Sequence, residues 1–319
     1  MTSAKQQVLS ALIAGSALLA GCQTVQAQPE SGERQIGVAA GNGEYPAIAY
    51  AREDAPGYTF FRPQVLPEDK LPVVIWGNGG CRDNGLSAGH FLREIASHGY
   101  LVIANGRPGE ERPPLAALPA GPLSPPPAGP PPPPRNVPDE TTVAQMLAAI
   151  DWAAAANADP ANPLAGHIDP ERVAVMGHSC GGLQALSAAA DPRVDAVVAF
   201  ASGVYNRPTG GLSGVAITKD NLVRLHTPVA YVLGGPTDIA FPNGSDDFAR
   251  IAHVPAMLLN LPVGHGGTFA LANGGDWARV GAEWLNWQLR GDSDAERSFI
   301  GDGCRLCTTY GWSIERKGF

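Results

Sequence analysis

The pentapeptide Gly177-His178-Ser179-Cys180-Gly181 constrains the fold more than any other feature of this chain. It follows the apolar, strand-like run 173–176 and precedes the helix-like run 183–190. A Gly-x-Ser-x-Gly sequence in that context is typical of a turn too tight for side chains at its two glycines. It predicts that Ser179 is a nucleophile raised above the sheet edge, with the Cys180 amide directed at a developing oxyanion. The alternative is a chance match in a glycine-rich chain.

An acidic residue and a histidine follow Ser179, each after a later apolar run. The run 228–233 leads into a turn that ends at Asp238, and the run 255–261 leads to His265 on a glycine-flanked loop. Because the carboxyl ends of parallel strands meet at one edge of a sheet, His265 is predicted to act as general base. Asp238 would then orient its imidazole. The simpler interpretations are a turn cap for Asp238 and an ordinary loop histidine for His265.

Two further acids, Asp246 and Asp247, could compete with Asp238 for this role. They favour the start of a helix over 247–252, because acidic residues stabilise the positive end of the helix dipole. Asp238 is therefore the preferred candidate.

A second set of oxyanion donors is expected after an earlier strand. The run Val73 to Trp76 is strand-like, and Gly77-Asn78-Gly79-Gly80 follows it. Glycine lets the backbone approach a substrate oxygen, so Gly79 and Gly80 are the candidate donors. A generic glycine loop is the alternative. Asn78 stands where a glycine is more usual, and whether its side chain also donates stays open.

These elements together resemble the α/β-hydrolase family, over roughly residues 55 to 290. The chain is similar to the secreted serine hydrolases grouped with dienelactone hydrolase, chlorophyllase and the cutinase-like polyester hydrolases. The resemblance implies an α/β fold with a doubly wound, mostly parallel sheet flanked by helices. It also implies a serine carboxylester hydrolase in which Ser179, Asp238 and His265 form the triad. The scaffold alone does not define the substrate, because related folds cleave esters, amides and other groups.

The secondary-structure pattern agrees with alternating strands and helices. Apolar stripes predict helices over 88–97, 139–156 and 276–290, and apolar runs predict strands over 100–104 and 194–200. These stripes are expected to form core.

Aromatic residues on loops near the predicted site are candidates for lining an acyl pocket: Trp76, Tyr205, Phe241 and Phe269. Each is equally compatible with ordinary packing. The expected substrate is a small or polymeric ester. A peptidase or amidase of the same fold is the alternative enzyme. A non-catalytic surface lipoprotein that binds a partner is the alternative outside enzymes.

The N-terminus indicates export. Lys5 precedes the apolar stretch 8–20, which is too short to span a membrane and typical of a signal peptide. Leu19-Ala20-Gly21-Cys22 resembles a lipoprotein cleavage box, so residues 1–22 are expected to be a signal with Cys22 lipidated. Residues 23–43 would be a tether and 44–319 the catalytic domain. The alternatives are cleavage after Ala27 and an uncleaved anchor.

The expected location is the outer membrane or periplasm, as a lipoprotein, or else secretion. Gln23, rather than an aspartate, favours the outer membrane by resemblance to the sorting rule.

A proline-rich insert separates the strand ending at Ala104 from the next helix. Residues 108–138 hold 14 of the chain's 30 prolines, with 130–134 unbroken. Such a segment favours polyproline II or an irregular loop over sheet. It is predicted to border the active site, as a lid, a wall or a partner ligand; a solvated insertion without function is the alternative.

The cysteines fit an oxidising compartment. Apart from Cys22, four remain, and they allow three pairings. Cys81 follows the oxyanion glycines and Cys180 follows the nucleophile, so a bond between them is predicted to hold the oxyanion hole. Cys304 and Cys307 would then form a second bridge. Redox catalysis and a zinc site are weaker interpretations.

The net charge of −8 disfavours a nucleic-acid partner, because an acidic chain repels phosphate backbones. No phosphate loop or metal-ligand spacing is visible in the sequence, so no cofactor is expected. The membrane would be reached only through an N-terminal lipid.

Overall fold

The computed structural model describes residues 32–118, 140–207 and 215–319. Within these ranges ten strands form one sheet. In chain order they are β1 (Glu33–Ala40), β2 (Ala47–Arg52), β3 (Tyr58–Pro63), β4 (Leu71–Gly77), β5 (Leu101–Asn105), β6 (Ile168–His178), β7 (Ala196–Phe200), β8 (Val229–Leu233), β9 (Ala256–Asn260) and β10 (Ser313–Lys317).

The sheet is parallel in its centre and antiparallel at both edges. Its order is β1-β2-β3-β5-β4-β6-β7-β8-β9-β10. The six strands from β5 to β9 in this order pair in parallel, whereas β1, β2, β3 and β10 pair antiparallel. The carboxyl ends of β4, β6, β8 and β9 therefore lie at one edge. This arrangement confirms the mostly parallel sheet that the sequence predicts.

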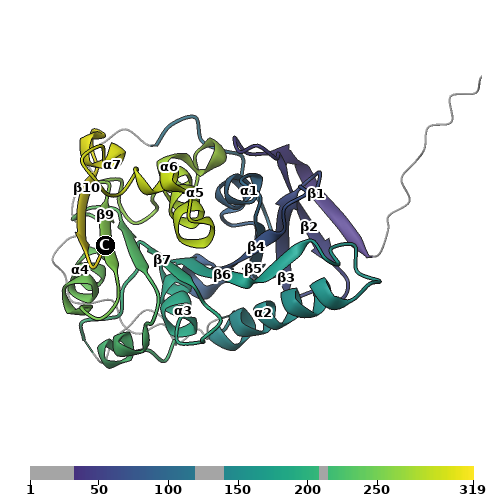
Figure 1. Cartoon of the computed structure of the whole chain (residues 1–319), viewed down its shortest axis with the longest axis horizontal. Coiled ribbons are helices and arrows are strands. Elements are labelled where there is room, and N and C mark those ends of the chain that lie inside the picture. The colour runs from purple at the N-terminus through teal and green to yellow at the C-terminus, as the bar shows by residue number, and fades with distance from the viewer. Residues whose placement is uncertain (1–31, 119–139, 208–214) are drawn as a thin grey trace, which may run out of the picture.

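Helices cover both faces of the sheet (Figure 1). On one face lie α1 (Gly89–Ser97) and α5 (Gly275–Arg290), and on the other lie α2 (Val143–Ala158) and α3 (Cys180–Ala188), with α4 (Phe241–Arg250) further along. The short elements are η1 (Gly79–Cys81), η2 (Lys219–Arg224), η3 (Ala272–Gly274), α6 (Ser293–Glu296) and α7 (Arg305–Thr308).

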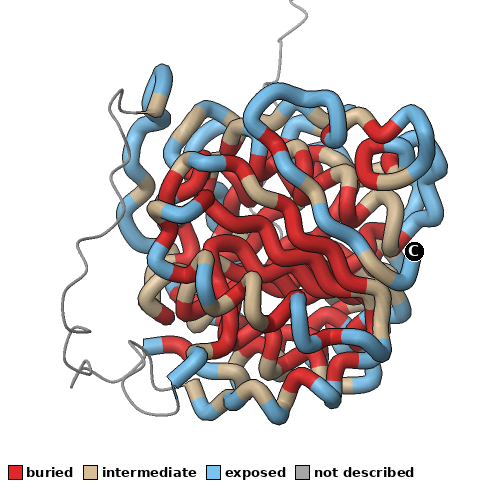
Figure 2. Tube along the Cα trace, turned by 90° about the vertical axis from the view of Figure 1, so that its left-hand side faces the viewer, coloured by how far each residue is buried: buried red, intermediate tan, exposed pale blue. Residues whose placement is uncertain are grey.

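The core has two halves because successive strand residues face opposite sides of the sheet. In β4, Val74 and Trp76 pack with α1 and α5, whereas Val73 and Ile75 pack with α2 and α3. Figure 2 shows the strands as a continuous buried layer inside a partly exposed shell. The predicted helix stripes contribute to this core: Phe91, Leu92, Ile95, Met146, Ile150, Val280, Trp284 and Leu285 are all buried.

Two edge strands were not predicted. Residues 23–43 were expected to be a tether, but Glu33–Ala40 forms β1 against β2. Its side chains are largely exposed, and so are those of β10, so neither strand has the apolar run that marks a buried strand. The tether prediction is therefore wrong for residues 33–40.

Helix boundaries also differ from expectation. The helix predicted over 139–156 begins at Val143, because the Thr142 side chain caps it by accepting a 3.1 Å hydrogen bond from the amide of Gln145. The helix predicted over 247–252 instead runs from Phe241 to Arg250, with a proline in its first turn. Asp246 and Asp247 therefore lie towards its end.

Several predictions fall outside the described residues. They include the signal segment with Cys22 and most of the proline-rich insert, since residues 1–31 and 119–139 are not described. Across the ranges that are described, no helix combines the length and the apolar character needed to cross a bilayer. In the same ranges no three His, Cys, Asp or Glu side chains gather in a way that could hold a metal ion.

Candidate active site

Ser179 sits at a sharp turn between β6 and α3. Its φ of 54° and ψ of −116° are disfavoured for a residue with a side chain, at a cost of about 1–3 kcal/mol. The surrounding backbone holds this conformation. The Ser179 amide donates to the carbonyl of Phe200 at 2.9 Å, and the Ser202 hydroxyl donates to the Ser179 carbonyl at 2.7 Å. The turn therefore has the tight strand-to-helix geometry that the pentapeptide predicts, with Ser179 at its apex.

Glycines permit this turn because three backbone segments meet there. Gly77 and Gly177 are paired neighbours in β4 and β6. A Cβ on Gly177 would lie 2.2 Å from the carbonyl oxygen of Gly181, and one on Gly181 would lie 2.1 Å from that of Gly77. No side chain fits at such distances, so the first turn of α3 can contact both strand ends only if all three residues are glycine.

Ser179, His265 and Asp238 form a continuous hydrogen-bonded chain. Ser179 Oγ lies 3.0 Å from His265 Nε2, and His265 Nδ1 lies 2.7 Å from Asp238 Oδ1. The three residues follow β6, β9 and β8, whose carboxyl ends share an edge. The structure thus brings together the three residues that the sequence singles out.

The Asp238 carboxylate is buried and held by hydrogen bonds. The residue is 1% exposed, and its oxygens accept from the amides of Gly234 at 3.0 Å and Ala240 at 2.8 Å in addition to His265. Burial opposes ionisation, but the hydrogen bonds from His265 and the two amides outweigh it and lower the pKa of Asp238 below its ordinary value. Asp238 is therefore ionised at neutral pH and keeps His265 Nδ1 protonated.

The rival acid Asp247 has a separate structural role. It is fully buried, accepts from the amide of Val204 at 2.7 Å and forms an ion pair with Lys219 at 2.5 Å. Burial raises the pKa of Asp247 to about 6 in spite of these partners. Asp246 also pairs with Lys219, at 2.9 Å. Both acids thus connect α4 to η2.

The two candidate oxyanion glycines, Gly79 and Gly80, have different surroundings. A Cβ on Gly79 would lie 2.5 Å from His178 Nδ1, so this residue directly adjoins the turn that carries Ser179. Gly80 has a φ of 66° and turns the chain towards Cys81. Cys180 is the first residue of α3, where backbone amides point out of the helix end.

Disulfides join both predicted cysteine pairs. Cys81 and Cys180 are bonded with their Cα atoms 5.3 Å apart, and this bridge connects the Gly79 loop directly to the start of α3. Cys304 and Cys307 form the second bridge. The first bond therefore holds the two predicted oxyanion segments together.

Asn78 organises the loop rather than the oxyanion hole. Its side-chain nitrogen donates both hydrogens to backbone carbonyls, those of Arg82 at 3.1 Å and of Asn105. Its side-chain oxygen accepts from Trp76 Nε1 at 3.0 Å and from the Ser87 hydroxyl at 3.2 Å. All its polar atoms are thus engaged, which answers the question that the sequence left open.

His178 is a site residue that the sequence analysis did not recognise. Its Nε2 lies 2.8 Å from the backbone carbonyl of His265, so Nε2 carries the hydrogen and donates. Burial, together with the neighbouring His265 imidazole, lowers the pKa of His178 to about 4. The ring is therefore neutral at pH 7 and braces the loop that carries His265. Its place inside the pentapeptide was the available signal.

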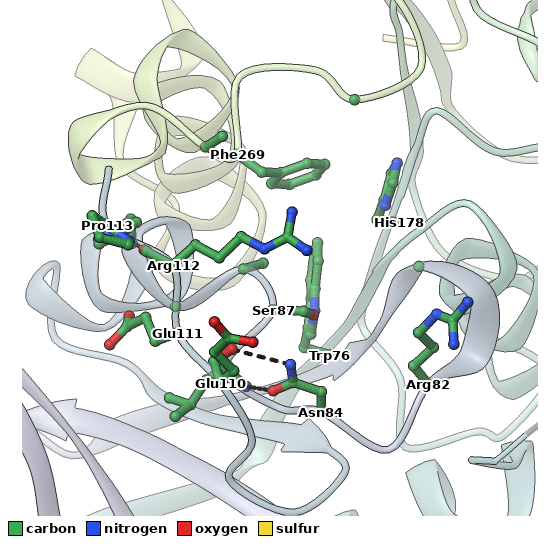
Figure 3. A pocket seen from close by; sticks show the side chains of 17 residues that line it. Trp76, Arg82, Asn84, Ser87, Glu110, Glu111, Arg112, Pro113, His178 and Phe269 are labelled. Carbon is green, nitrogen blue, oxygen red and sulfur yellow. Dashed lines mark hydrogen bonds between the residues drawn. The ribbon is translucent and has the colours of Figure 1, made fainter. Parts of the chain in front are cut away.

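A cavity of about 450 Å³ (Figure 3) has His178 and Gly266, the chain neighbours of Ser179 and His265, in its lining. The lining also includes Gly79, a predicted oxyanion donor. Trp76 and Phe269, two of the four predicted pocket aromatics, also line it, with ring centroids 5.6 Å apart.

The other two predicted aromatics lie elsewhere. Tyr205 and Phe241 are partly buried against the core half formed by α2, α3 and α4, and they do not line this cavity. Their proposed contact with substrate stays a prediction.

Removing the Cys81–Cys180 bond should destabilise the fold substantially. The bond spans 99 residues, and a loop of that length corresponds to about 4–5 kcal/mol of unfolding free energy in the chain-entropy model. We expect the double variant Cys81→Ser/Cys180→Ser to lose about that amount in denaturant unfolding.

The second bridge provides a matched control. Cys304 and Cys307 are separated by 3 residues, so Cys304→Ser/Cys307→Ser should cost about 2 kcal/mol. Equal losses in the two double variants would contradict this account.

His178 should make the fold less stable in mild acid. Its pKa is about 4 when folded and about 6.5 when unfolded, so between these values the unfolded chain binds the extra proton. Stability is then lost as the pH falls from 6.5 towards 4. From pH 7.5 to 5 the loss should be about 2 kcal/mol.

The measurement is the free energy of unfolding at both pH values for the natural chain and for His178→Gln. The variant should lack this part of the pH dependence. An identical pH dependence in both proteins would show that His178 does not cause it.

One family of known proteins matches the segment that carries Ser179. The family model described as PETase, PET hydrolase-like, matches residues 135–209, a segment that includes β6, Ser179 and β7. No curated protein matches the chain. The family match confirms the resemblance to polyester hydrolases that the sequence motifs indicate. The chain thus has the α/β-hydrolase fold and, over the segment that carries Ser179, is similar to the PET hydrolase-like family.

Proposed function

We propose that this protein is a serine hydrolase that cleaves carboxylic esters through an acyl-enzyme intermediate. The observation that carries the proposal is the chain of contacts from Ser179 Oγ through His265 to the buried Asp238, at 3.0 and 2.7 Å. The similarity to the PET hydrolase-like family supports ester cleavage in particular, because the name of that family refers to a polyester.

The proposed reaction uses each group in a defined order. His265 Nε2 takes the proton of the Ser179 hydroxyl as its oxygen attacks the ester carbonyl carbon, and Asp238 stabilises the imidazolium that forms. The alcohol leaves with the proton from His265, which gives an acyl-serine. Water activated by His265 then releases the acid and restores the serine.

The amides of Gly79 and Cys180 are the proposed oxyanion donors. One such donor is typically worth about 10²–10³ in rate. Their loops are linked by the Cys81–Cys180 bond, which supports a hole that is formed before substrate binds. Gly80, the other candidate from the sequence, acts in this proposal as the turning residue.

We also propose, on sequence grounds, that the chain is exported and lipidated at Cys22. The apolar stretch 8–20 and the tetrapeptide that ends at Cys22 support this location. Mass spectrometry of the N-terminal peptide from the membrane fraction tests it. A lipid-modified Cys22 at the N-terminus is expected, and an unmodified N-terminus that begins elsewhere would contradict it.

Replacing the nucleophile tests the mechanism. Ser179→Ala should lower kcat for p-nitrophenyl esters by about 10⁴- to 10⁶-fold, because the acyl-enzyme can no longer form. Asp238→Asn should lower it by about 10⁴-fold through the wrong imidazole tautomer. Ester turnover that survives in Ser179→Ala would exclude this mechanism.

The same assay separates an esterase from an amidase of the same fold. Each p-nitrophenyl ester is paired with the p-nitroanilide of the same acid. We expect the esters to have the higher kcat/KM, and better turnover of the anilides would reverse the assignment.

A further inference from the structure

The cavity lined by His178 and Gly266 carries an arginine whose charge has no partner. Arg112 lies after β5, in residues 108–118, the described part of the proline-rich insert. Figure 3 shows its side chain reaching into the cavity, with the guanidinium between Phe269 and Trp76. Among the described residues, no side chain or carbonyl forms a hydrogen bond or an ion pair with this guanidinium.

The backbone around Arg112 is held from three sides. The Arg112 carbonyl lies 2.9 Å from His90 Nε2 of α1, and the Glu110 carbonyl accepts from Asn84 at 3.1 Å. The amide of Leu115 donates to the carbonyl of Ala270 at 2.7 Å. The side chain therefore projects from an anchored loop. This loop does not need to become ordered when a ligand binds in the cavity.

The charges around the cavity favour an anion. Glu111 is neutralised by an ion pair with Arg93, a buried residue of α1. Arg82, the second cation on the lining, likewise has no ion-pair partner within the described chain, and Figure 3 shows it across the cavity from Arg112. Glu110 is the one lining carboxylate that is not in an ion pair among the residues described. In the part of the chain that is described, the lining thus holds two cations outside any ion pair, Arg112 and Arg82, and one such carboxylate, Glu110.

We propose that Arg112 binds a carboxylate on the substrate, so that the preferred esters carry a second, ionised carboxyl group. This inference rests on the proposed function, since it assigns a substrate class to the same site. A guanidinium matches a carboxylate with two parallel hydrogen bonds. Phe269, which is 9% exposed, supplies apolar surface beside it, whereas Trp76 at the cavity wall is fully buried. A volume of about 450 Å³ suits a small organic acid.

The test compares esters that differ only in that carboxylate. One pair is the p-nitrophenyl esters of 4-carboxybenzoic and 4-methylbenzoic acid, whose rigid rings keep the carboxylate from attacking its own ester. The other pair, 4-carboxyphenyl and 4-methylphenyl acetate, places the charge on the alcohol side. In each pair the ratio of kcat/KM for the charged ester over the neutral one is measured.

Arg112→Gln should lower this ratio about tenfold in at least one pair, which corresponds to a lost charge-assisted hydrogen bond at a partly solvated site. Glu110→Gln should raise the same ratio, because it removes the opposing charge. Arg82→Gln is the matched control, since it removes one positive charge from the same lining, and it should change the ratio less than Arg112→Gln does.

The outcomes distinguish the two proposals. In one outcome, the natural chain cleaves the charged and the neutral ester of each pair while Arg112→Gln leaves the ratio unchanged in both pairs. That result overturns the carboxylate site and leaves the proposed esterase function intact. A fall in the ratio caused by Arg82→Gln instead overturns the assignment to Arg112. No turnover of any of the four esters by the natural chain overturns the proposed function and, with it, this inference.

Discussion

The contact between the first turn of α3 and the ends of β4 and β6 is the constraint on which the site depends. Gly77, Gly177 and Gly181 approach so closely that their carbonyl oxygens occupy the space a Cβ would need. This contact forces Ser179 into its disfavoured conformation and raises its hydroxyl above the sheet. It also brings the loop after β4 next to α3, where the Cys81–Cys180 bond joins them. Close packing of the backbone thus sets the positions of the side chains in the site.

The electrostatics of the site follow from the balance, at each buried group, between the cost of burial and the hydrogen bonds that oppose it. Asp238 and Asp247 are both buried carboxylates, yet the pKa of Asp238 is lowered and that of Asp247 is raised. Asp238 receives two backbone amides and His265, and this outweighs its burial. His178 is kept neutral, so it holds the loop of His265 without adding a positive charge beside the imidazole.

Much of this arrangement could be predicted from sequence because short motifs dictate it. The elbow around Ser179, the turn before Asp238 and the glycine-flanked His265 each follow an apolar run, and parallel strands bring such ends together. The edge strand β1 was missed because its side chains are mostly exposed and carry no apolar signal. The start of α4 was misplaced because the acidic pair at 246 and 247 suggested a helix start, whereas Asp247 is buried against Lys219.

Other features depend on tertiary contacts that have no local pattern. Nothing in the sequence around Asn78 indicates that its amide satisfies the carbonyls of Arg82 and Asn105. The position of Arg112 depends on contacts with α1 and with the loop after His265, far away in the chain. The sequence shows that such residues are polar or basic. Their position in the site can be seen only in the folded structure.

The most direct test of the central claim is covalent labelling of the nucleophile. The folded protein is treated with a fluorophosphonate, digested and analysed by mass spectrometry, with Asp238→Asn treated in parallel. The account predicts a single adduct on Ser179 that forms far more slowly in the variant, because His265 is no longer held in the tautomer that accepts the hydroxyl proton. An adduct on another residue, or equal labelling rates in the two proteins, would contradict it.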